Sequence, residues 1–304
     1  MTLVRDATFE LLGTSDRDGL GEGPSWNVAD QRLYWVDITG QRVRSSDLNA
    51  TDVRQWATPT AVGFAVPDDQ GQLVIGLQHG LARLDPASGH IQLGRQVDDR
   101  PDHRLNDGKT DRAGRLWFGS MHSPETEPSS RFYRVDATSV TTVFDTVITS
   151  NGLGWSPDNT TMYYTDSKTN RIRAFDFDAA SGTIAYPRVF ATDPAGQFVP
   201  DGLTVDAEGY VWGAKWGGGR VIRYAPNGKI ALDLRFPVAR ITSCMFAGTK
   251  LDHLVVTSAR GPADDEPLAG RVFLVDPHTH GIAETPVSAQ TLATALGDRP
   301  GPQA

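Results

Sequence analysis

The sequence is poor in cysteine and has no long apolar run. A single cysteine, Cys244, stands among 304 residues, so no disulfide can form within the chain. No apolar run approaches the roughly 20 residues needed to span a bilayer, and residues 1–10 lack the basic start and apolar core of a signal peptide. These absences predict a cytoplasmic protein without a membrane partner.

Basic charge and helical periodicity are also scarce. The 29 lysines and arginines are outnumbered by 37 acidic residues, and no basic cluster interrupts the net charge of −8. A surface that tracks phosphates needs a basic face, so nucleic acid is excluded as a partner. The best helical candidate is Val287–Leu296, and the Pro/Gly-rich end, residues 297–304, is expected to be a disordered tail. Residues 1–296 are expected to form one domain, as a monomer or weak homodimer.

Glycine-led strand patterns recur along the whole chain. Each copy has a glycine followed by alternating residues, then a turn, an aromatic-rich strand, and a further strand that often ends in aspartate. The six copies start near Gly23, Gly63, Gly108, Gly152, Gly202 and Cys244. Their spacing of roughly 40–50 residues is the length of a four-stranded propeller blade. A β-sandwich is the alternative, but a sandwich requires no fixed period.

The repeat therefore predicts an all-β fold, a six-bladed β-propeller of four-stranded antiparallel blades. The N-terminal strand, Leu3–Leu12, is left over from the six copies. It is expected to join the last blade and close the ring, which leaves no long open edge for aggregation.

Polar residues recur at one phase of this repeat, at the start of the first strand of each copy. The residues at this phase are Glu22, Val62, Asn106–Asp107, Asn151, Asp201 and Ser243. First strands line the central channel of a propeller, so four of the six blades would bring a carboxylate or carboxamide to one mouth. Converging oxygen atoms favour a hard divalent cation.

Hairpin turns are the alternative interpretation, because Asn-Gly and Asp-Gly are strong turn signals. Glu22–Gly23 fits the same phase without being a turn former. Separate turn signals also lie between the first and second strands, at Asp69–Gly71, Ala113–Gly114, Pro157–Asn159 and Glu208–Gly209. We therefore interpret the first set as a site and the second as turns.

Five segments carry a family resemblance that runs from about Phe9 to Pro277. They are Leu20–Trp26 (LGEGPSW), Arg104–Lys109 (RLNDGK), Ser150–Trp155 (SNGLGW), Pro200–Leu203 (PDGL) and Thr242–Cys244 (TSC). These segments resemble motifs of the SMP-30/gluconolactonase/luciferin-regenerating-enzyme-like family. The resemblance implies a six-bladed propeller that hydrolyses aldonic or uronic sugar lactones with one divalent metal ion (Ca, Zn, Mn, Mg or Fe(II)).

The resemblance also implies roles for individual residues. Glu22, Asn151 and Asp201 match the metal ligands of the family, and Asp201 also matches its proposed general base. Arg104 and Asn106 match groups that hold the hydroxyls and ring oxygen of the sugar.

One departure concerns an acidic contact. Family members can place a substrate-contacting Glu shortly after a Gly-Thr-Met stretch, whereas here Gly119–Met121 is followed by His122, Ser and Pro. The acidic contact is therefore expected to be missing, which leaves open the choice of sugar and whether His122 or His103 substitutes for this contact.

Other functions remain open at this stage. A calcium-binding regulatory propeller would bind metal without turnover, and an ester or phosphotriester hydrolase could use the same fold. A platform for protein interactions gives no reason for oxygen donors to converge at the axis. A serine esterase lacks its Gly-x-Ser-x-Gly elbow. Cys244 has no paired base in view, so we interpret it as a buried structural thiol.

Overall fold

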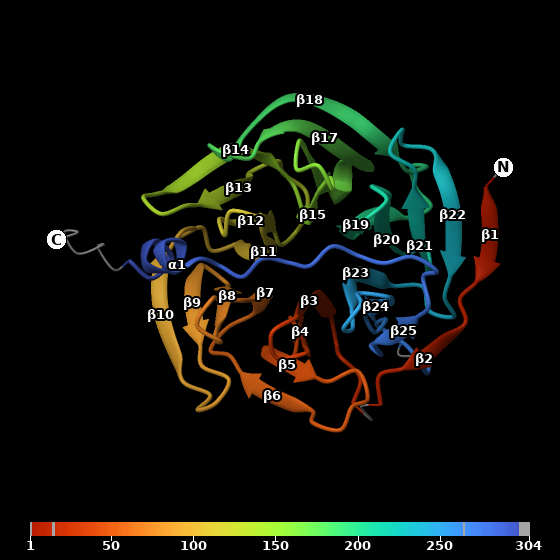
Figure 1. Cartoon of the computed structure of the whole chain (residues 1–304), viewed down its shortest axis with the longest axis horizontal. Coiled ribbons are helices and arrows are strands. Elements are labelled where there is room, and N and C mark those ends of the chain that lie inside the picture. Colours follow the sequence, from red (N-terminus) through yellow and green to blue (C-terminus); the bar gives the residue numbers. More distant parts are fainter. Residues whose placement is uncertain (1, 14–15, 264, 298–304) are drawn as a thin grey trace.

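Six sheets surround a central axis in the computed structural model, which describes residues 2–13, 16–263 and 265–297 (Figure 1). The predicted six-bladed propeller is confirmed. Blades 1 to 3 contain β3 (Gly21–Asn27), β4 (Arg32–Asp37), β5 (Arg42–Ser46) and β6 (Arg54–Ala57); β7 (Val62–Pro67), β8 (Leu73–Leu77), β9 (Gly80–Leu84) and β10 (Ile91–Gln96); and β11 (His103–Thr110), β12 (Leu116–His122), β13 (Ser130–Val135) and β14 (Val140–Val147).

The other three blades follow the same order from the axis outward. They contain β15 (Ser150–Trp155), β16 (Thr161–Asp166), β17 (Arg171–Asp178) and β18 (Thr183–Thr192); β19 (Val199–Val205), β20 (Val211–Trp216), β21 (Arg220–Tyr224) and β22 (Ile230–Arg235); and β23 (Ile241–Ala247), β24 (His253–Ser258) and β25 (Phe273–Val275). A short 3-10 helix, η1 (Ser167–Thr169), follows β16.

The turns between the first and second strands of the blades lie at the positions predicted from the sequence. Gly71, Gly114, Asn159 and Gly209 have φ values of 79°, 76°, 60° and 85°. This left-handed region suits glycine and asparagine, so these residues allow tight hairpins.

The N-terminal segment closes the ring in two pieces. β2 (Phe9–Leu11) pairs antiparallel with β25 and completes blade 6. β1 (Leu3–Asp6) instead pairs parallel with β22, as a fifth strand of blade 5. The predicted closure is confirmed, but the expectation that the whole segment joins the last blade is wrong. The reason is the free edge of β22, which β1 covers with main-chain hydrogen bonds.

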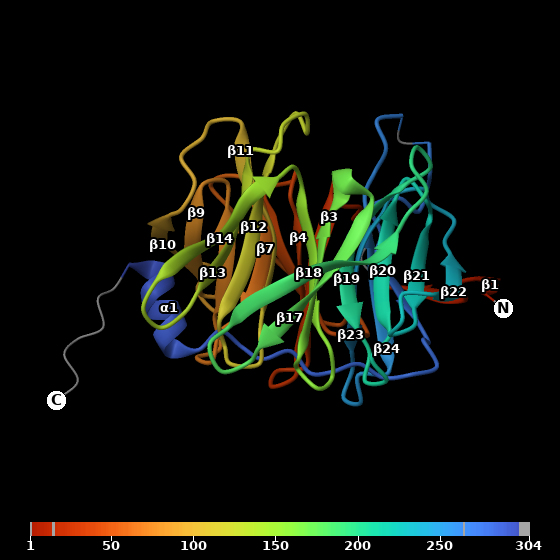
Figure 2. The same ribbon diagram turned by 90° about the horizontal axis from the view of Figure 1, so that it is seen from above.

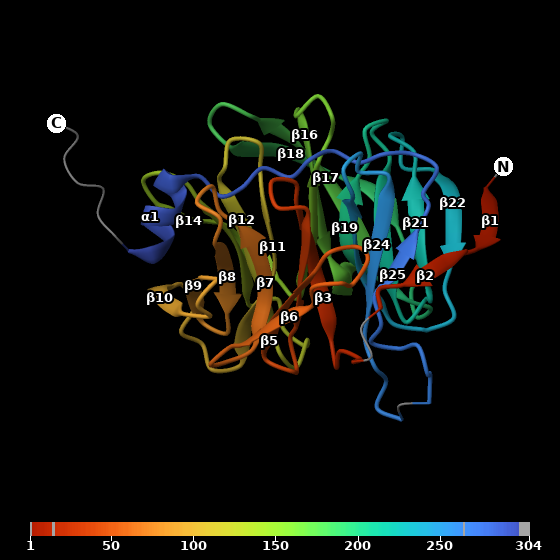
Figure 3. The ribbon, with the colours of Figure 1, turned by 60° about the horizontal axis from the view of Figure 1, so that its bottom comes forward.

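The C-terminal segment crosses one face of the propeller after β25, as Figures 1 and 3 show. We call residues 277–288 the strap. The strap leads into α1 (Ala289–Leu296), whose N-cap Ser288 accepts a hydrogen bond from the Thr291 amide. Gly297 ends the helix in the left-handed region, and the rest of the predicted tail, 298–304, lies outside the described residues. In the part of the chain that the structure describes, no helix is long and apolar enough to cross a membrane.

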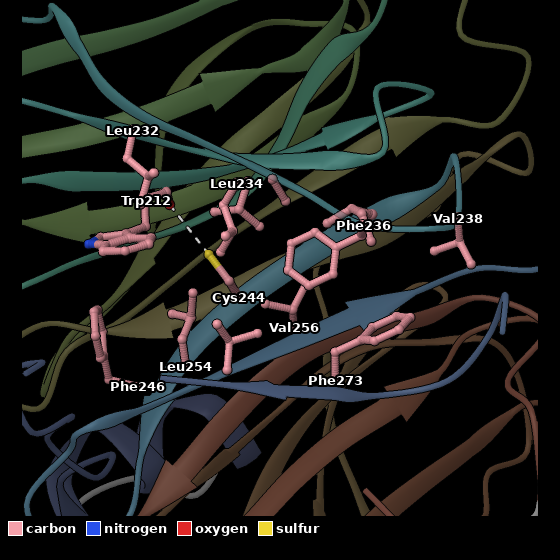
Figure 4. Packing of buried hydrophobic residues seen from close by; sticks show 14 of the residues in the cluster. Trp212, Leu232, Leu234, Phe236, Val238, Cys244, Phe246, Leu254, Val256 and Phe273 are labelled. Atoms are coloured by element: carbon pink, nitrogen blue, oxygen red, sulfur yellow. Dashed lines mark hydrogen bonds between the residues drawn. The ribbon is translucent and has the colours of Figure 1, made fainter. Parts of the chain in front are cut away.

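Apolar side chains fill the space between neighbouring blades. Between blades 5 and 6, Trp212 and Phe246 pack together with Cys244 (Figure 4). The Cys244 thiol is buried and donates to the Trp212 carbonyl at 3.4 Å. Burial raises the pKa of this thiol to about 12, so it is structural, as predicted. The indole nitrogen of Trp212 donates to the buried carboxylate of Asp206, which anchors the second strand of its blade.

Candidate active site

A β-bulge interrupts each of the six inner strands at the phase singled out in the sequence. The pairing shifts between Glu22 and Ser25 on β3, and between Asn151 and Leu153 on β15. Equivalent shifts occur on β7, β11, β19 and β23. A bulge bends its strand and re-aims a side chain. The recurrent polar residues are therefore strand residues turned toward the axis rather than hairpin turns.

Glycines beside these bulges allow neighbouring inner strands to approach closely. A Cβ atom on Gly152 would lie 2.6 Å from the carbonyl oxygen of Asp201. A Cβ atom on Gly63 would lie 2.6 Å from the carbonyl oxygen of Asn106. Any side chain at Gly63 or Gly152 would push neighbouring blades apart, so these two glycines allow the close approach of the inner strands.

A cavity of about 240 Å³ opens at the mouth where the inner strands begin. This mouth faces away from the strap, which runs along the lower face in Figure 2. Glu22, Asn106, Asn151 and Asp201 all line the cavity, and each of these residues is 5% exposed. Arg104 lines it as well, so the structure brings all five predicted site residues together.

The other three residues of the same phase do not line this cavity. Val62 is fully buried in the core of blades 1 and 2. Asp107 and Ser243 line a smaller cavity deeper in the channel. Asn106 and Asp107 both lie in the bulge of β11, between Leu105 and Gly108, and they line different cavities.

Burial and mutual repulsion dominate the electrostatics of the site. Burial, reinforced by the charge of Glu22, raises the pKa of Asp201 well above its ordinary value. Burial, reinforced by Asp107, does the same for Glu22. Burial raises the pKa of Asp107 itself to about 6. Burial thus disfavours the ionised form of each of these three carboxyl groups in the absence of a cation.

The donor set fits an oxygen-liganded divalent cation. Asp201 Oδ1 is buried without a hydrogen-bond partner among the described residues, and Glu22 accepts a hydrogen bond from the neighbouring Gly23 amide at 3.0 Å. A cation between Glu22, Asn151 and Asp201 would satisfy the free oxygen and offset the repulsion. No group of three or more His, Cys, Asp or Glu side chains in the described chain could hold a metal, so the third protein donor would be the amide oxygen of Asn151.

A hydrogen-bond network orients the two asparagines. Asn151 Nδ2 donates to Ser167 Oγ at 2.9 Å, which leaves its Oδ1 facing the site. Asn106 Nδ2 donates to this Oδ1 at 3.1 Å and to the Ser150 carbonyl at 2.6 Å. Asn106 Oδ1 accepts from Arg104 at 2.5 Å. Asn106 therefore links the guanidinium of Arg104, on blade 3, to the side-chain amide of Asn151, on blade 4.

Glu125, which the sequence interpretation missed, supplies the acidic group that was expected to be absent. Its carboxylate lines the same cavity, accepts from Thr149 Oγ1 at 3.0 Å and pairs with Lys168 at 2.8 Å. The loop between β12 and β13 begins at Ser123, directly after His122, and Glu125 is its third residue. The loop therefore brings a carboxylate to the cavity at a place where the sequence led us to expect none.

The two histidines proposed as substitutes do not line the cavity. His103 and His122 are cross-strand neighbours on β11 and β12, and their ring centroids are 5.2 Å apart. His103 Nε2 lies 3.0 Å from Ser129 Oγ. Both rings pack beside the site mouth rather than into it. Trp216, in contrast, lines the cavity.

A second cavity of about 280 Å³ lies at the opposite end of the channel, below the strap. Trp26, Val66 and Pro286 form its apolar walls. Its one carboxylate, Glu284, is already paired with Lys109 at 3.3 Å. This end of the channel therefore gathers no oxygen cluster comparable to that of the site mouth.

Comparisons with known proteins find relatives that match most of the chain. The model of a family described as the SMP-30/Gluconolactonase/LRE-like region matches residues 20–260. The L-arabinolactonase of Azospirillum brasilense is 37% identical over 306 residues, which cover 97% of each chain. Regucalcin of Danio rerio is 36% identical over 258 residues, 84% of this chain and 88% of that protein. A solved calcium-binding protein, regucalcin from Agrobacterium tumefaciens, superposes with a TM-score of 0.90 at 28% identity, covering 94% of this chain and 99% of that one.

Proposed function

Because the chain belongs to the SMP-30/gluconolactonase/LRE-like family, we propose that it is a hydrolase that opens sugar lactones with one divalent metal ion. The observation that carries the proposal is the buried, unpartnered Oδ1 of Asp201 beside Glu22 and Asn151. Relatives named L-arabinolactonase and pentonolactonase, at 37% and 33% identity, support a small aldonic lactone as substrate.

Glu22, Asn151 and Asp201 would hold the metal through oxygen atoms. When bound, the metal supplies Lewis-acid polarisation of the lactone carbonyl and favours the ionised form of Asp201. Calcium, manganese, magnesium, zinc and iron(II) all remain compatible with this donor set.

Asp201 would act as the general base. Its carboxylate accepts a proton from the water that attacks the lactone carbon, then returns that proton to the ring oxygen as the carbon–oxygen bond breaks. The product is the open-chain hydroxy acid, and Asp201 is regenerated. The partly buried Arg104, with its guanidinium on Asn106, would donate hydrogen bonds to the ring hydroxyls. The apolar side chains of Ile38 and Trp216 would cover the rest of the ring.

A test is acid release by metal-stripped protein, with five- and six-membered aldonolactones and each divalent metal added back in turn. We expect turnover only with metal, and a loss on the order of 10³-fold in kcat for Asp201→Asn, which is the usual range for a general base. Asp252→Asn, at a surface carboxylate whose side chain is 47% exposed, is the matched control and should keep full activity.

Calcium binding without turnover is the second candidate function, because regucalcins are among the relatives at 36% identity. The same experiment separates the two. Tight binding of calcium with no acid release from any lactone would favour the second candidate. If the Asp201→Asn variant opened lactones at the wild-type rate, the general-base role of Asp201 would be contradicted, although the protein would still be a lactonase.

A further inference from the structure

Lys109 crosses the central channel behind the proposed metal ligands. It lies on β11, three residues beyond Asn106, and its Nζ donates to the carbonyl oxygen of Leu203 at 3.2 Å. Leu203 lies on β19, two residues beyond Asp201. One lysine therefore connects two inner strands that each carry a site residue.

Glu284 of the strap connects Lys109 to a third inner strand, β3. Glu284 Oε1 lies 3.3 Å from Lys109 Nζ. Glu284 Oε2 accepts a hydrogen bond from Ser25 Oγ at 2.9 Å. Ser25 lies on β3, three residues beyond Glu22. A single carboxylate from outside the repeat is thus joined, directly or through Lys109, to the strands that carry Glu22, Asn106 and Asp201.

The strap is fixed on both sides of Glu284. The Gly281 amide donates to the Leu251 carbonyl at 2.8 Å, and the Val287 amide donates to the Pro67 carbonyl at 2.9 Å. These anchors lie on blades 6 and 2, the two neighbours of blade 1, and the strap crosses the face of the propeller (Figure 1). Glu284 is held over the axis as a result.

The charges of this pair are shielded from solvent. The side chains of Lys109 and Glu284 are 17% and 15% exposed. An ion pair so enclosed is screened less by salt than a surface pair. Asp107 lines the same cavity as Lys109 and Glu284 and also interacts with the charge of Lys109. Removal of Glu284 therefore takes away one of the two carboxyl groups that face Lys109, and removal of Lys109 leaves both carboxyl groups without this cation, so we expect the strands that they contact to rearrange.

We propose that Glu284 and Lys109 are positioning residues for the metal ligands at the opposite end of the channel. The strap carboxylate fixes the spacing of β3, β11 and β19, and that spacing sets the distance between the ligands Glu22 and Asp201 and the place of Asn106 beside them. The inference rests on the proposed function for the identity of the ligand set.

The test measures Mn²⁺ affinity of metal-stripped, full-length protein by titration calorimetry. The variants are Glu284→Gln, Lys109→Met and the double variant. Each single substitution should weaken Mn²⁺ binding about tenfold, as loss of outer supports of a metal site commonly does. The double variant should be no weaker than either single one, since the two side chains act as one unit. In lactone hydrolysis, kcat should fall more than KM rises.

A matched control separates positioning from general support of the fold. Asp69→Ala removes the hydrogen bond from the Ala289 amide to Asp69 Oδ2, which anchors the strap at the rim rather than in the channel. It should lower the melting temperature and leave Mn²⁺ affinity within twofold. Unchanged affinity in Glu284→Gln and Lys109→Met would overturn the inference, as would equal weakening by Asp69→Ala. Wild-type protein that binds no metal and opens no lactone would instead overturn the proposed function, and with it the role given to Glu284.

Discussion

Gly152→Ala tests whether close approach of the inner strands sets the active site. The added Cβ would lie 2.6 Å from the Asp201 carbonyl oxygen and 2.7 Å from the Leu203 amide nitrogen, both of them backbone atoms. Contacts below 3.0 Å essentially never occur, so β15 and β19 must separate by at least about 0.4 Å. Overpacking of this kind costs about 1–3 kcal/mol. For a chain of this size, the melting temperature should fall by roughly 2–10 °C.

The same displacement should reduce activity, because Asn151 and Asp201 lie on the two strands that move. A misplacement of about 1 Å can cost on the order of 100-fold in rate, so we expect a loss of roughly 10- to 100-fold in kcat/KM. Gly154→Ala is the matched control, since its Cβ would meet only the ends of the Leu203 and Val205 side chains, at 2.9 and 3.0 Å. Calorimetry and the acid-release assay report both effects. If folded Gly152→Ala protein keeps activity within twofold of wild type, or if Gly154→Ala loses as much, the reasoning fails.

Three further predictions concern charge. Lys168→Met should raise KM about threefold with little change in kcat, because Glu125 at the cavity rim loses its partner; steady-state kinetics with a neutral lactone measure this, and Lys168→Arg should restore KM. The raised pKa of Asp107 stabilises metal-free protein below about pH 4, and this contribution is lost as the pH rises through about 6. Melting temperatures in chelator should therefore decline across that window, and Asp107→Asn should flatten the decline. Cys244 should not react with a thiol reagent until the protein unfolds, because burial raises its pKa to about 12; rapid labelling of native protein would contradict its buried position.

The repeat in the sequence was enough to predict most of the fold and the residues at the centre of the candidate site. A polar residue followed by glycine marks the bulge on the inner strand, and that pattern depends only on neighbours in sequence. Because every blade starts its inner strand at the same mouth, one phase of the repeat was enough to bring Glu22, Asn106, Asn151 and Asp201 to one cavity. Arg104 follows from its place two residues before Asn106 on β11.

Residues outside the repeat could not be placed in this way. Glu125 reaches the cavity from a loop of irregular length, and Lys168 comes from η1, which has no counterpart in the other blades. Glu284 lies beyond the last strand, so no periodic pattern assigns it to the channel. The pairing of β1 with β22 also depends on which sheet edge is left open, a property of the assembled ring rather than of the segment itself.

The split N-terminal segment has a consequence for the order in which the protein folds. Blades 1 to 4 are each built from contiguous stretches of chain, so they can form from local hairpins as they leave the ribosome. β1 and β2 emerge first, yet their partners in β22 and β25 are among the last strands to be synthesised. Contacts so distant in sequence form slowly, because the loop-closure entropy must be overcome before they stabilise anything. We therefore expect ring closure to follow the formation of blades 1 to 4, because it pairs β1 and β2 with strands that are synthesised last.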